Sequence, residues 1–313
     1  MREFIIKEND ADQRVDKFIT KTLNEMPKAL MYKYIRNKKI KVNRSRCEIS
    51  QRLQIGDTVQ CYIAEEFFKD EHDYSFLNAS NKLDIVYEDD NILIINKPIG
   101  LITHSDINET VDTLINRVKH YLYINKFYNP NEELSFTPAL AHRIDRNTEG
   151  LVIAAKNAAT IRAINNAILE HQIEKTYICI CEGRMPKKQD MLIGYHKKLD
   201  NNTAKIIDHC ETGYVKVETG YKVLEEKQDY SLCEVNLISG KSHQIRAQFA
   251  ALKHPLLSDI KYGAKQREFK YQALCAYKIK FNFENDHFLS YLNKKEIFIS
   301  KPLLLQYFNT KLN

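Results

Sequence analysis

Residues 142–156 read HRIDRNTEGLVIAAK, and this stretch joins a polar cluster directly to an apolar run. The apolar part, residues 151–155, predicts a buried strand. Polar side chains at the entrance of a strand are held rigidly while they stay open to a cleft, which is a usual setting for a site. Asp145 lies between Arg143 and Arg146 in the chain, and nearby cations favour an ionised carboxylate. The pattern alone leaves open a functional carboxylate or a structural ion pair that caps the strand.

Short strand-like runs and a few helices surround this stretch. The expected elements are strands over residues 83–87, 92–96 and 151–155 and helices over residues 110–122, 157–170 and about 242–253. A polar excursion covers residues 123–137, and short β-like runs dominate from residue 175 onward. Runs of strands with few helices predict an α+β fold with a mixed, mainly antiparallel sheet and flanking helices. A doubly wound parallel sheet is disfavoured.

The first 60 residues predict a separate small unit. Apolar residues at helical spacing mark a helix over residues 12–24, and Pro27 fits the first turn of a second helix that runs to about residue 37. Strands follow over residues 39–43 and 57–63. We therefore expect a helix–helix–strand domain over residues 1–63, a linker over residues 64–82, and a second domain over residues 83–313.

Positive charge is concentrated in this N-terminal unit. Residues 1–60 carry 14 of the 47 Lys and Arg and 8 of the 41 Asp and Glu, which leaves 33 of each sign for the rest of the chain. Eight basic side chains and no acidic one lie between residues 28 and 46: Lys28, Lys33, Arg36, Lys38, Lys39, Lys41, Arg44 and Arg46. A field of one sign favours a polyanionic partner, either nucleic acid or an anionic membrane surface. A solvated basic face is the plainer alternative. The membrane is disfavoured because this stretch lacks a broad apolar face with Trp or Phe.

Composition and cysteine usage exclude several classes of protein. The 313 residues are 43% hydrophobic and 28% charged, which is ordinary for globular proteins and unlike disordered or fibrous ones. The start, MREFIIKEND, lacks the apolar segment of a secretory signal, and no apolar run approaches the ~20 residues that span a bilayer. Seven scattered cysteines do not suggest a disulfide framework. Cys179 and Cys181 fit a strand interior with both thiols on one face better than a zinc site. We expect a reducing, cytoplasmic location and no membrane partner.

Three further segments place polar residues beside apolar strands. They are NKPIGL at residues 96–101, EKTY at residues 174–177, and GKSHQIR at residues 240–246. The last one predicts a glycine turn, a Ser242 N-cap and a helix whose buried stripe begins at Ile245. Arg246 then lies at the edge of the buried face, where it needs an anion, and Asp145 is available.

The N-terminal unit resembles the S-four-type RNA-binding module, named after a ribosomal protein. The stretches RVDKFITKTL, IRNKKIKVN and RLQIGDTV approximate the module's R-L-D-x-F-L opening, its I-R-x-x-x-I-x-V-N centre and its R-L-x-x-G-D close. Arg44 departs from the module, which usually has Gly at this position. The resemblance implies that structured RNA binds along the second helix and the following loop, where the eight basic residues lie.

The four polar segments, in their order, resemble the RluA-type RNA pseudouridine synthase family over residues 82–281. HRIDRNTEGLVIAAK is similar to the family's H-R-L-D-x-x-T-S-G-L-L-x-x-A-K. NKPIGLITH, EKTYICICEG and EVNLISGKSHQIRAQFAALKHPLLSDIKYG resemble its other motifs. Glu149, Ser258 and Cys275 depart from the pattern, at positions that bear on substrate and loop shape more than on the reaction. Members of the family often carry the S-four-type module in front.

The resemblance implies that uridine in RNA becomes pseudouridine. The N-glycosidic bond breaks, the uracil turns, and its carbon five bonds to the ribose. Asp145 matches the family's catalytic carboxylate, which acts as nucleophile or as base. Arg246 matches the residue that keeps this carboxylate ionised and oriented, and Tyr177 matches an aromatic residue that stacks on the uracil and assists proton removal at carbon five.

The same resemblance implies the substrate-binding residues and the partners. Arg143 matches a residue that fills the gap left by the flipped nucleotide, and we assign His142 and Ile245 to the substrate-binding set. No redox or hydrolytic step occurs, so we expect no metal and no organic cofactor. Structured RNA is the expected partner, with large-subunit ribosomal RNA favoured over transfer RNA, and we expect a monomer.

Two other functions remain open at this point. A non-catalytic RNA-binding protein would not need Asp145, Tyr177 and Arg246, all of which are present. A hydrolase acting on glycosides would need a second carboxyl group within ~5–10 Å of the first, and Glu149 is the nearby candidate.

Overall fold

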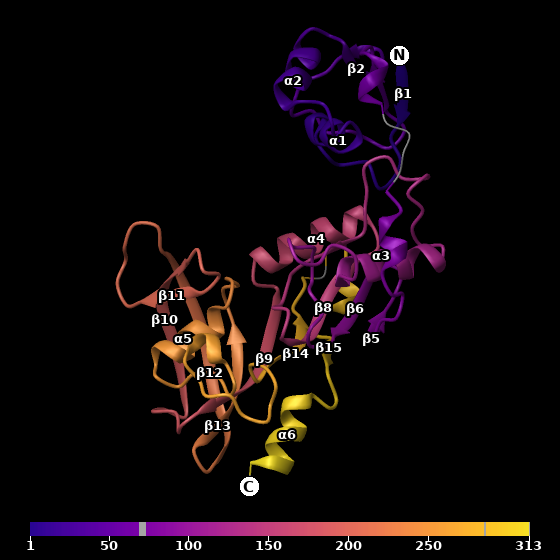
Figure 1. The fold of residues 1–313 in the computed structure, drawn as a ribbon. Helices are drawn as coiled ribbons and strands as arrows, with labels where there is room; N and C mark the ends of the chain where they lie inside the picture. Colours follow the sequence, from indigo (N-terminus) through magenta and orange to yellow (C-terminus); the bar gives the residue numbers. More distant parts are fainter. Residues whose placement is uncertain (69–72, 285, 313) are drawn as a thin grey trace.

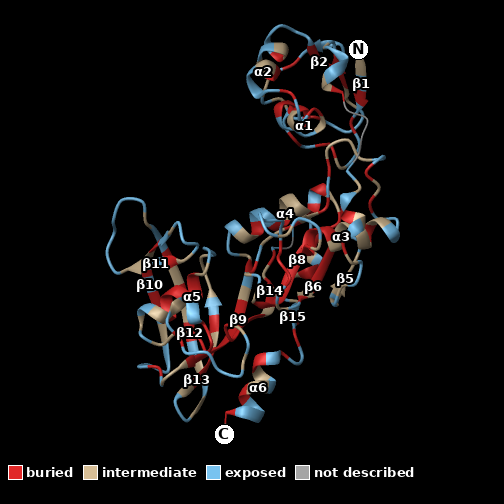
Figure 2. Ribbon diagram, viewed as in Figure 1, coloured by how far each residue is buried: buried red, intermediate tan, exposed pale blue. Residues whose placement is uncertain are grey.

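The computed structural model describes residues 1–68, 73–284 and 286–312. Figure 1 shows a small N-terminal unit beside a larger part that is built on one long sheet. Figure 2 shows that the central strands of that sheet are buried. None of the helices in the described ranges is both long and apolar enough to cross a bilayer.

The N-terminal unit packs two helices on a small antiparallel sheet. Its elements are β1 (Arg2–Ile5), α1 (Val15–Thr22), α2 (Lys28–Arg36), β2 (Ile40–Val42), β3 (Ser45–Arg46) and β4 (Thr58–Cys61). The strand order is β1-β4-β2-β3. Phe18 and Ile19 of α1 are buried in its core, as the helical spacing predicted, and Met31 and Ile35 of α2 are buried there too. The first strand, β1, was not predicted, because its four residues are too short a pattern to recognise.

The large sheet has eleven strands. They are β5 (Ile85–Glu88), β6 (Ile92–Lys97), β7 (Ala139–Leu140), β8 (Glu149–Ala155), β9 (Ile173–Glu182), β10 (Gln189–Lys198), β11 (Ala204–Ile207), β12 (Val215–Lys227), β13 (Tyr230–Leu237), β14 (Leu274–Phe281) and β15 (Glu296–Phe298). The main order is β11-β10-β12-β13-β9-β14-β8-β6-β5, with β15 on β14 and β7 on β8. Among the described pairings only β8 with β14 is parallel. The predicted α+β fold with a mixed, mainly antiparallel sheet is confirmed.

Helices cover both faces of the large sheet. They are α3 (Leu114–Ile124), α4 (Ala158–Leu169), α5 (Gln244–Ala251) and α6 (Leu303–Lys311), with short 3-10 turns η1 (Glu65–Phe67), η2 (Ser75–Asn78), η3 (Ile260–Tyr262) and η4 (Ser290–Leu292). Apolar residues of α3 and α5 pack in the core on one face, together with Cys179 and Cys181 of β9. Residues of α4 and α6 pack in the core on the other face. The prediction that both thiols share one face of a strand is therefore confirmed.

Two helix starts differ from the predictions. Helix α3 begins at residue 114 and not at residue 110, because the Thr113 side chain accepts a hydrogen bond from the Asn116 amide and caps the helix there. Ser242 is not the N-cap of α5. The chain turns at His243 instead, whose φ of 56° is left-handed, and the helix starts at Gln244. Helix α6 was not predicted.

The polar excursion after α3 packs against the N-terminal unit. Asp10 is fully buried there and accepts hydrogen bonds from the amide and hydroxyl of Ser135, at 3.0 and 2.7 Å. The side-chain amide of Gln13 donates to the same hydroxyl at 2.7 Å, and Leu134 packs against the N-terminal core. The side-chain oxygen of Asn9 accepts from the amide that opens α4. The excursion therefore holds the N-terminal unit against the larger part of the chain.

The segment predicted as a linker belongs partly to each core. Phe68 is buried in the N-terminal core, and Phe76 is buried in the core beneath α3. Residues 69–72, between them, lie outside the described residues. The predicted linker therefore contributes one residue to each hydrophobic core, Phe68 to the N-terminal one and Phe76 to that of the larger part.

Candidate active site

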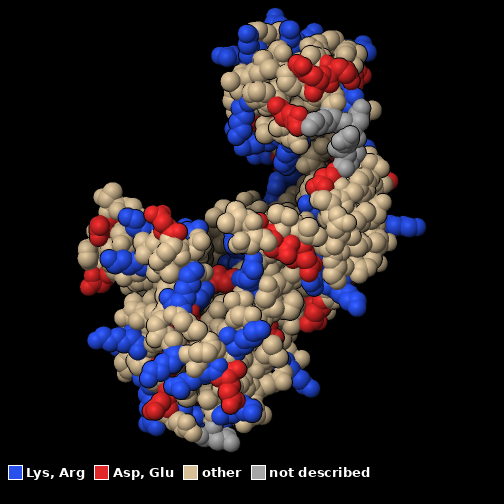
Figure 3. Space-filling model, in the orientation of Figure 1, with Lys and Arg blue, Asp and Glu red and all other residues tan. Residues whose placement is uncertain are grey.

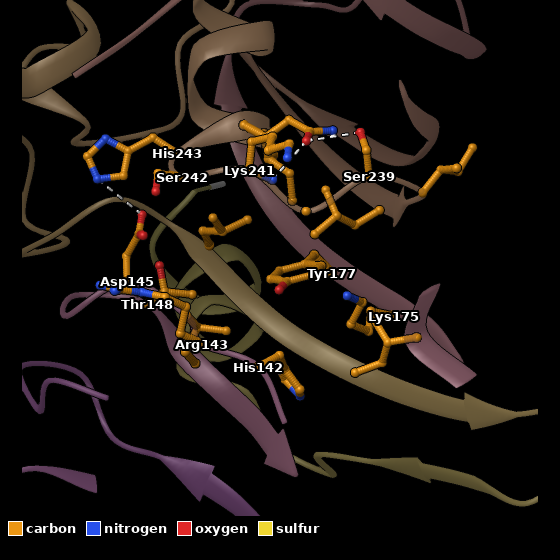
Figure 4. A pocket seen from close by; sticks show the side chains of 18 of the residues that line it. His142, Arg143, Asp145, Thr148, Lys175, Tyr177, Ser239, Lys241, Ser242 and His243 are labelled. Atoms are coloured by element: carbon orange, nitrogen blue, oxygen red, sulfur yellow. Dashed lines mark hydrogen bonds and ion pairs between the residues drawn. The ribbon is translucent and has the colours of Figure 1, made fainter. Parts of the chain in front are cut away.

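One cavity of about 560 Å³ collects residues from several distant parts of the sequence. The loop that precedes β8, the start of β9 and the turn that leads into α5 carry its polar residues (Figure 4), and residues at the end of α4 and Leu274 of β14 also line it. All six residues predicted from the catalytic and substrate motifs line it: His142, Arg143, Asp145, Tyr177, Ile245 and Arg246. The eight basic residues lie apart from it, in the N-terminal unit.

The loop that carries Asp145 is fixed by hydrogen bonds from Lys97 and Thr103. Lys97, at the end of β6, is completely buried, and its ammonium group donates to the backbone carbonyls of Pro98, Leu101 and Arg146. The Thr103 hydroxyl donates to the Ile144 carbonyl at 2.9 Å. Burial lowers the pKa of Lys97 to about 7. The motif NKPIGL therefore supplies the support of the catalytic loop, a role that the sequence did not reveal.

Asp145 is oriented by Arg246. The Arg246 Nη1 donates to the Asp145 Oδ2 at 3.0 Å, as the sequence led us to expect. The same guanidinium also forms two hydrogen bonds of 2.7 Å with Asp259, which is almost fully buried. Asp259 is part of the last motif, but its role was missed, because the sequence does not show that Arg246 binds two carboxylates.

The two arginines beside Asp145 in the chain behave differently from expectation. Arg146 points away and pairs with Asp106 at 3.1 Å, where both side chains are largely exposed. Arg143 is exposed and lines the cavity near Asp145 (Figure 4). The charge that meets Asp145 therefore comes from α5 and not from Arg146, because the loop turns its neighbouring side chains in different directions.

His243 closes the same end of the cavity. Its Nε2 lies 3.7 Å from the Asp145 Oδ2, and its Nδ1 is 3.0 Å from the Tyr262 hydroxyl. Burial lowers the pKa of His243, although Asp145 opposes this effect. The Arg246 guanidinium carbon also lies over the Tyr262 ring, 5.1 Å from the centre of that ring. These two residues complete the surroundings of Asp145, and the sequence had assigned no role to either.

Tyr177 lies in the middle of the cavity. It belongs to the central strand β9, opposite Val235 of β13 and Ala276 of β14, and it is nearly fully buried. Its hydroxyl forms no hydrogen bond with any residue that the structure describes. Burial raises the pKa of the Tyr177 phenol, and the negative charge of Asp145 raises it further. The phenol is therefore protonated at neutral pH, and its ring is available to a ligand.

The floor of the cavity is neutral. The His142 Nε2 accepts a hydrogen bond from the Ile153 amide at 3.3 Å. Burial lowers the pKa of His142 to about 3, with a further contribution from nearby Lys175. His142 is thus an uncharged imidazole at neutral pH. Ile245, the second residue of α5, adds an apolar surface.

The carboxyl group suggested for a hydrolase lies elsewhere. Glu149, at the start of β8, accepts a hydrogen bond from the Leu303 amide at 3.0 Å, and burial raises its pKa. It is not among the residues that line the cavity. Glu149 therefore anchors α6 to the sheet, and it does not face Asp145 across a ligand.

The basic stretch forms a surface of its own on the N-terminal unit. Seven of its eight side chains are exposed and Lys41 is partly buried, and none forms an ion pair with another described residue. Figure 3 shows Lys and Arg along the outer edge of this unit. Arg44 follows Asn43 in the two-residue turn between β2 and β3, and both have positive φ, 64° and 50°. A turn of this kind favours glycine, which explains why the resembling module usually has Gly there.

Comparison with known proteins identifies the family. The model of the RNA pseudouridylate synthase family matches residues 91–251. An uncharacterized RNA pseudouridine synthase of Mycoplasma capricolum subsp. capricolum is 35% identical over 95% of this chain and 97% of its own length. A ribosomal large subunit pseudouridine synthase C of Buchnera aphidicola subsp. Schizaphis graminum is 30% identical over 83% of this chain and 80% of its own.

A solved structure shows the same fold. The structure titled human RNA pseudouridylate synthase domain containing 4 aligns with a TM-score of 0.57 at 17% identity, over 72% of this chain and 91% of that one. At this identity the likeness concerns the fold alone. The sequence relatives and the family model carry the assignment, and they confirm that the chain resembles RNA pseudouridine synthases. The chain belongs to the RNA pseudouridylate synthase family.

Proposed function

We propose that this RNA pseudouridine synthase modifies specific uridines of large-subunit ribosomal RNA. Several relatives at 26–30% identity are named ribosomal large subunit pseudouridine synthase C. Their names support this target class. Transfer RNA is the alternative.

One observation carries the catalytic assignment. The Asp145 carboxylate is held by Arg246 on one side and opens into the cavity beside Tyr177 on the other. Cleavage of an N-glycosidic bond needs an ionised carboxylate at the sugar, as nucleophile or as base, and a guanidinium partner favours the ionised form. We assign this role to Asp145, and Arg246 orients it.

The remaining cavity residues fit a flipped uridine. A stacked nucleotide hides its sugar, so the target must leave the helix to reach Asp145. The buried ring of Tyr177 then offers a stacking surface for the uracil, and its unbonded hydroxyl is placed to assist at carbon five. Arg143, exposed at the mouth of the cavity, is suited to occupy the gap in the RNA. His142 and Ile245 bound the space for the base.

The N-terminal unit supplies RNA affinity in this proposal. We assign residues 1–63 to an S-four-type RNA-binding domain and the eight basic residues between 28 and 46 to phosphate contacts. Exposed cations without ion-pair partners are suited to displace counterions from RNA. Residues 83–313 form the catalytic domain.

Mapping of pseudouridines tests the target. RNA from cells that lack this protein is derivatised at pseudouridine and compared with RNA from the parent cells. Loss of one or a few sites in large-subunit ribosomal RNA is the expected result. Loss confined to transfer RNA would transfer the assignment to that substrate, and a full complement of pseudouridines in both RNA classes would contradict the proposal. Release of free uracil from the RNA would instead indicate a hydrolase.

A further inference from the structure

The cavity continues well beyond Tyr177, on the side away from Asp145. Figure 4 shows Lys175 on the side of Tyr177 away from Asp145, and Leu237 and Gly240 are also among the residues that line the cavity. Lys175 precedes Tyr177 by two residues on β9, so both side chains point to the same face of the sheet, about 7 Å apart along the strand. Asp145, Tyr177 and Lys175 thus follow one another along the cavity.

Lys175 is a cation without a counterion. Its ammonium group forms no hydrogen bond or ion pair with any residue in the described ranges. The acidic neighbour Glu174 points to the other face of β9, where it accepts a hydrogen bond from Asn282 at 2.7 Å. The adjacent His142 is neutral, and burial lowers the pKa of Lys175 as well. A partly buried charge with no partner is costly, and it is satisfied when a ligand brings the missing anion.

The backbone leaves room for this ammonium group. Gly240 lies above it, and a β-carbon added to Gly240 would meet only one described neighbour within 4 Å, the Lys175 Nζ at 3.8 Å. Apolar side chains also line this cavity, among them Ile168, Ile173, Leu237 and Leu274. An anion that reaches this end would therefore interact with Lys175 in surroundings that strengthen the attraction.

The order of the three residues indicates which anion arrives. With the ribose at Asp145 and the uracil ring on Tyr177, the edge of the base opposite the nitrogen bonded to the sugar points toward Lys175. When the glycosidic bond breaks, its electron pair stays on the uracil, and the negative charge spreads from the ring nitrogen to the two carbonyl oxygens. The pair returns to the sugar when carbon five bonds to the anomeric carbon. Carbon five then gives its proton to a base, and the ring nitrogen that left the sugar takes up a proton, so that the isomerisation balances.

We propose that Lys175 is a catalytic residue that contacts a uracil carbonyl oxygen and stabilises the negative charge of the detached base. The inference rests on the proposed function, because it requires a flipped uridine in this cavity. In this proposal Asp145 acts on the electron-poor sugar carbon, and Lys175 stabilises the negative charge on the uracil.

Two variants and two substrates test this role. Lys175→Met removes the charge at similar volume, and Lys175→Arg keeps it, while Lys198→Met, at the exposed end of β10, is the matched control. Each is assayed in single turnover with saturating RNA that carries either uridine or its carbon-five fluorinated analogue at the target. Fluorine makes uracil a better leaving anion, so it needs less help from the protein.

The expected pattern is a substrate-dependent loss. Lys175→Met should lower the rate of glycosidic cleavage about a hundredfold with uridine and about tenfold or less with the fluorinated base, with little change in RNA affinity. Lys175→Arg should retain more activity than Lys175→Met, and Lys198→Met should match the wild type. If Lys175→Met does not fold, Lys175→Gln, which keeps a donor without the charge, should show the same dependence on fluorine.

Other outcomes overturn the inference. Equal losses with both substrates would show that Lys175 only shapes the cavity. If its loss affects only affinity, and a methylphosphonate beside the target abolishes that effect, Lys175 binds a backbone phosphate instead. Both results presuppose active wild-type protein and leave the proposed function intact. Wild-type protein that converts no uridine in any RNA would contradict the proposed function itself.

Discussion

Asp259 holds Arg246 by two hydrogen bonds of 2.7 Å, and the arginine in turn reaches Asp145 with Nη1 at 3.0 Å. The side chains of Asp259 and Arg246 are 1% and 7% exposed, whereas that of Asp145 is 25% exposed. The buried pair is therefore a fixed support, and the more open carboxylate is the one that can meet a substrate. The two aspartates should respond very differently to the same substitution.

Asp145→Asn should abolish the reaction and leave the fold nearly unchanged. Asn keeps the shape but cannot act as an anionic nucleophile or base, so we expect a loss of about a hundredfold or more. Arg246 keeps both bonds to Asp259, so the melting temperature should change little. The measurement is tritium release from RNA labelled at carbon five of uracil, beside a binding assay. Release at the wild-type rate would refute the assignment, and loss of folding would instead favour a structural ion pair.

Asp259→Asn should damage both stability and activity. With a neutral residue at position 259, the buried Arg246 keeps only one carboxylate partner, the partly exposed Asp145, and this loss should cost on the order of 3 kcal/mol of unfolding free energy. At a temperature where the variant is folded, turnover should still fall at least about tenfold with unchanged RNA affinity, because the arginine no longer orients Asp145. Chemical denaturation and single-turnover rates check the two effects. Unchanged turnover in the folded variant would show that Asp259 is merely structural.

Lys97 should make stability depend on pH. Its pKa is lowered from 10.5 to about 7, so between these values the unfolded chain binds one proton more at this site than the folded chain. The free energy of unfolding should therefore rise with pH in this window, by up to about 1.4 kcal/mol per pH unit, and this dependence should be absent below pH 7. Lys97→Met is the reference, although it is less stable overall because three carbonyls lose their donor. A stability difference between the two proteins that is constant from pH 6 to 9 would contradict this expectation.

The sequence revealed the elements with a clear period and the residues that carry the chemistry. The buried run of β8, the amphipathic α1 and the helix α4 follow directly from the spacing of apolar residues. The resemblance brought Asp145, Tyr177 and Arg246 together, and the structure places them around one cavity.

What the sequence did not reveal depends on contacts between distant segments. The start of α5 is set by the left-handed His243 and not by Ser242, because the chain turns there to pack His243 against Tyr262. Asp259 lies thirteen residues after Arg246, and only the folded chain shows that the two interact. Lys97 looked like part of a strand end, but it donates to carbonyl groups of the turn that follows it, Pro98 and Leu101, and of the distant loop before β8, at Arg146. Contacts between residues far apart in the sequence produce no repeating pattern from which they could be predicted.

Tyr177→Phe should separate stacking from proton transfer. The ring packs in β9 independently of its hydroxyl, which has no partner among the described residues, so the variant should fold and keep RNA affinity within about threefold. Since Tyr177 lines the same cavity as Asp145 and its hydroxyl is proposed to act at carbon five, we expect glycosidic cleavage to proceed and the later release of tritium from carbon five to slow. Separate measurement of cleaved and rejoined product by quenched single turnover checks the order of events. Full turnover by Tyr177→Phe would exclude any need for the hydroxyl.

The basic surface of the N-terminal unit should govern how salt affects RNA binding. Deletion of the whole unit is a poor test, because it would expose Leu134 and the groups that contact it. We suggest Lys38→Gln with Lys39→Gln, compared with Lys17→Gln with Lys21→Gln on the exposed side of α1 in the same unit. Each lost phosphate contact should reduce the slope of log K against log salt by about 0.9, the value for duplex DNA. The first pair should therefore lower the slope by about 1.8 and weaken binding, with the cleavage rate at saturating RNA unchanged, whereas the control pair should change the slope little. Equal slopes for both pairs would mean that RNA is held elsewhere on the protein.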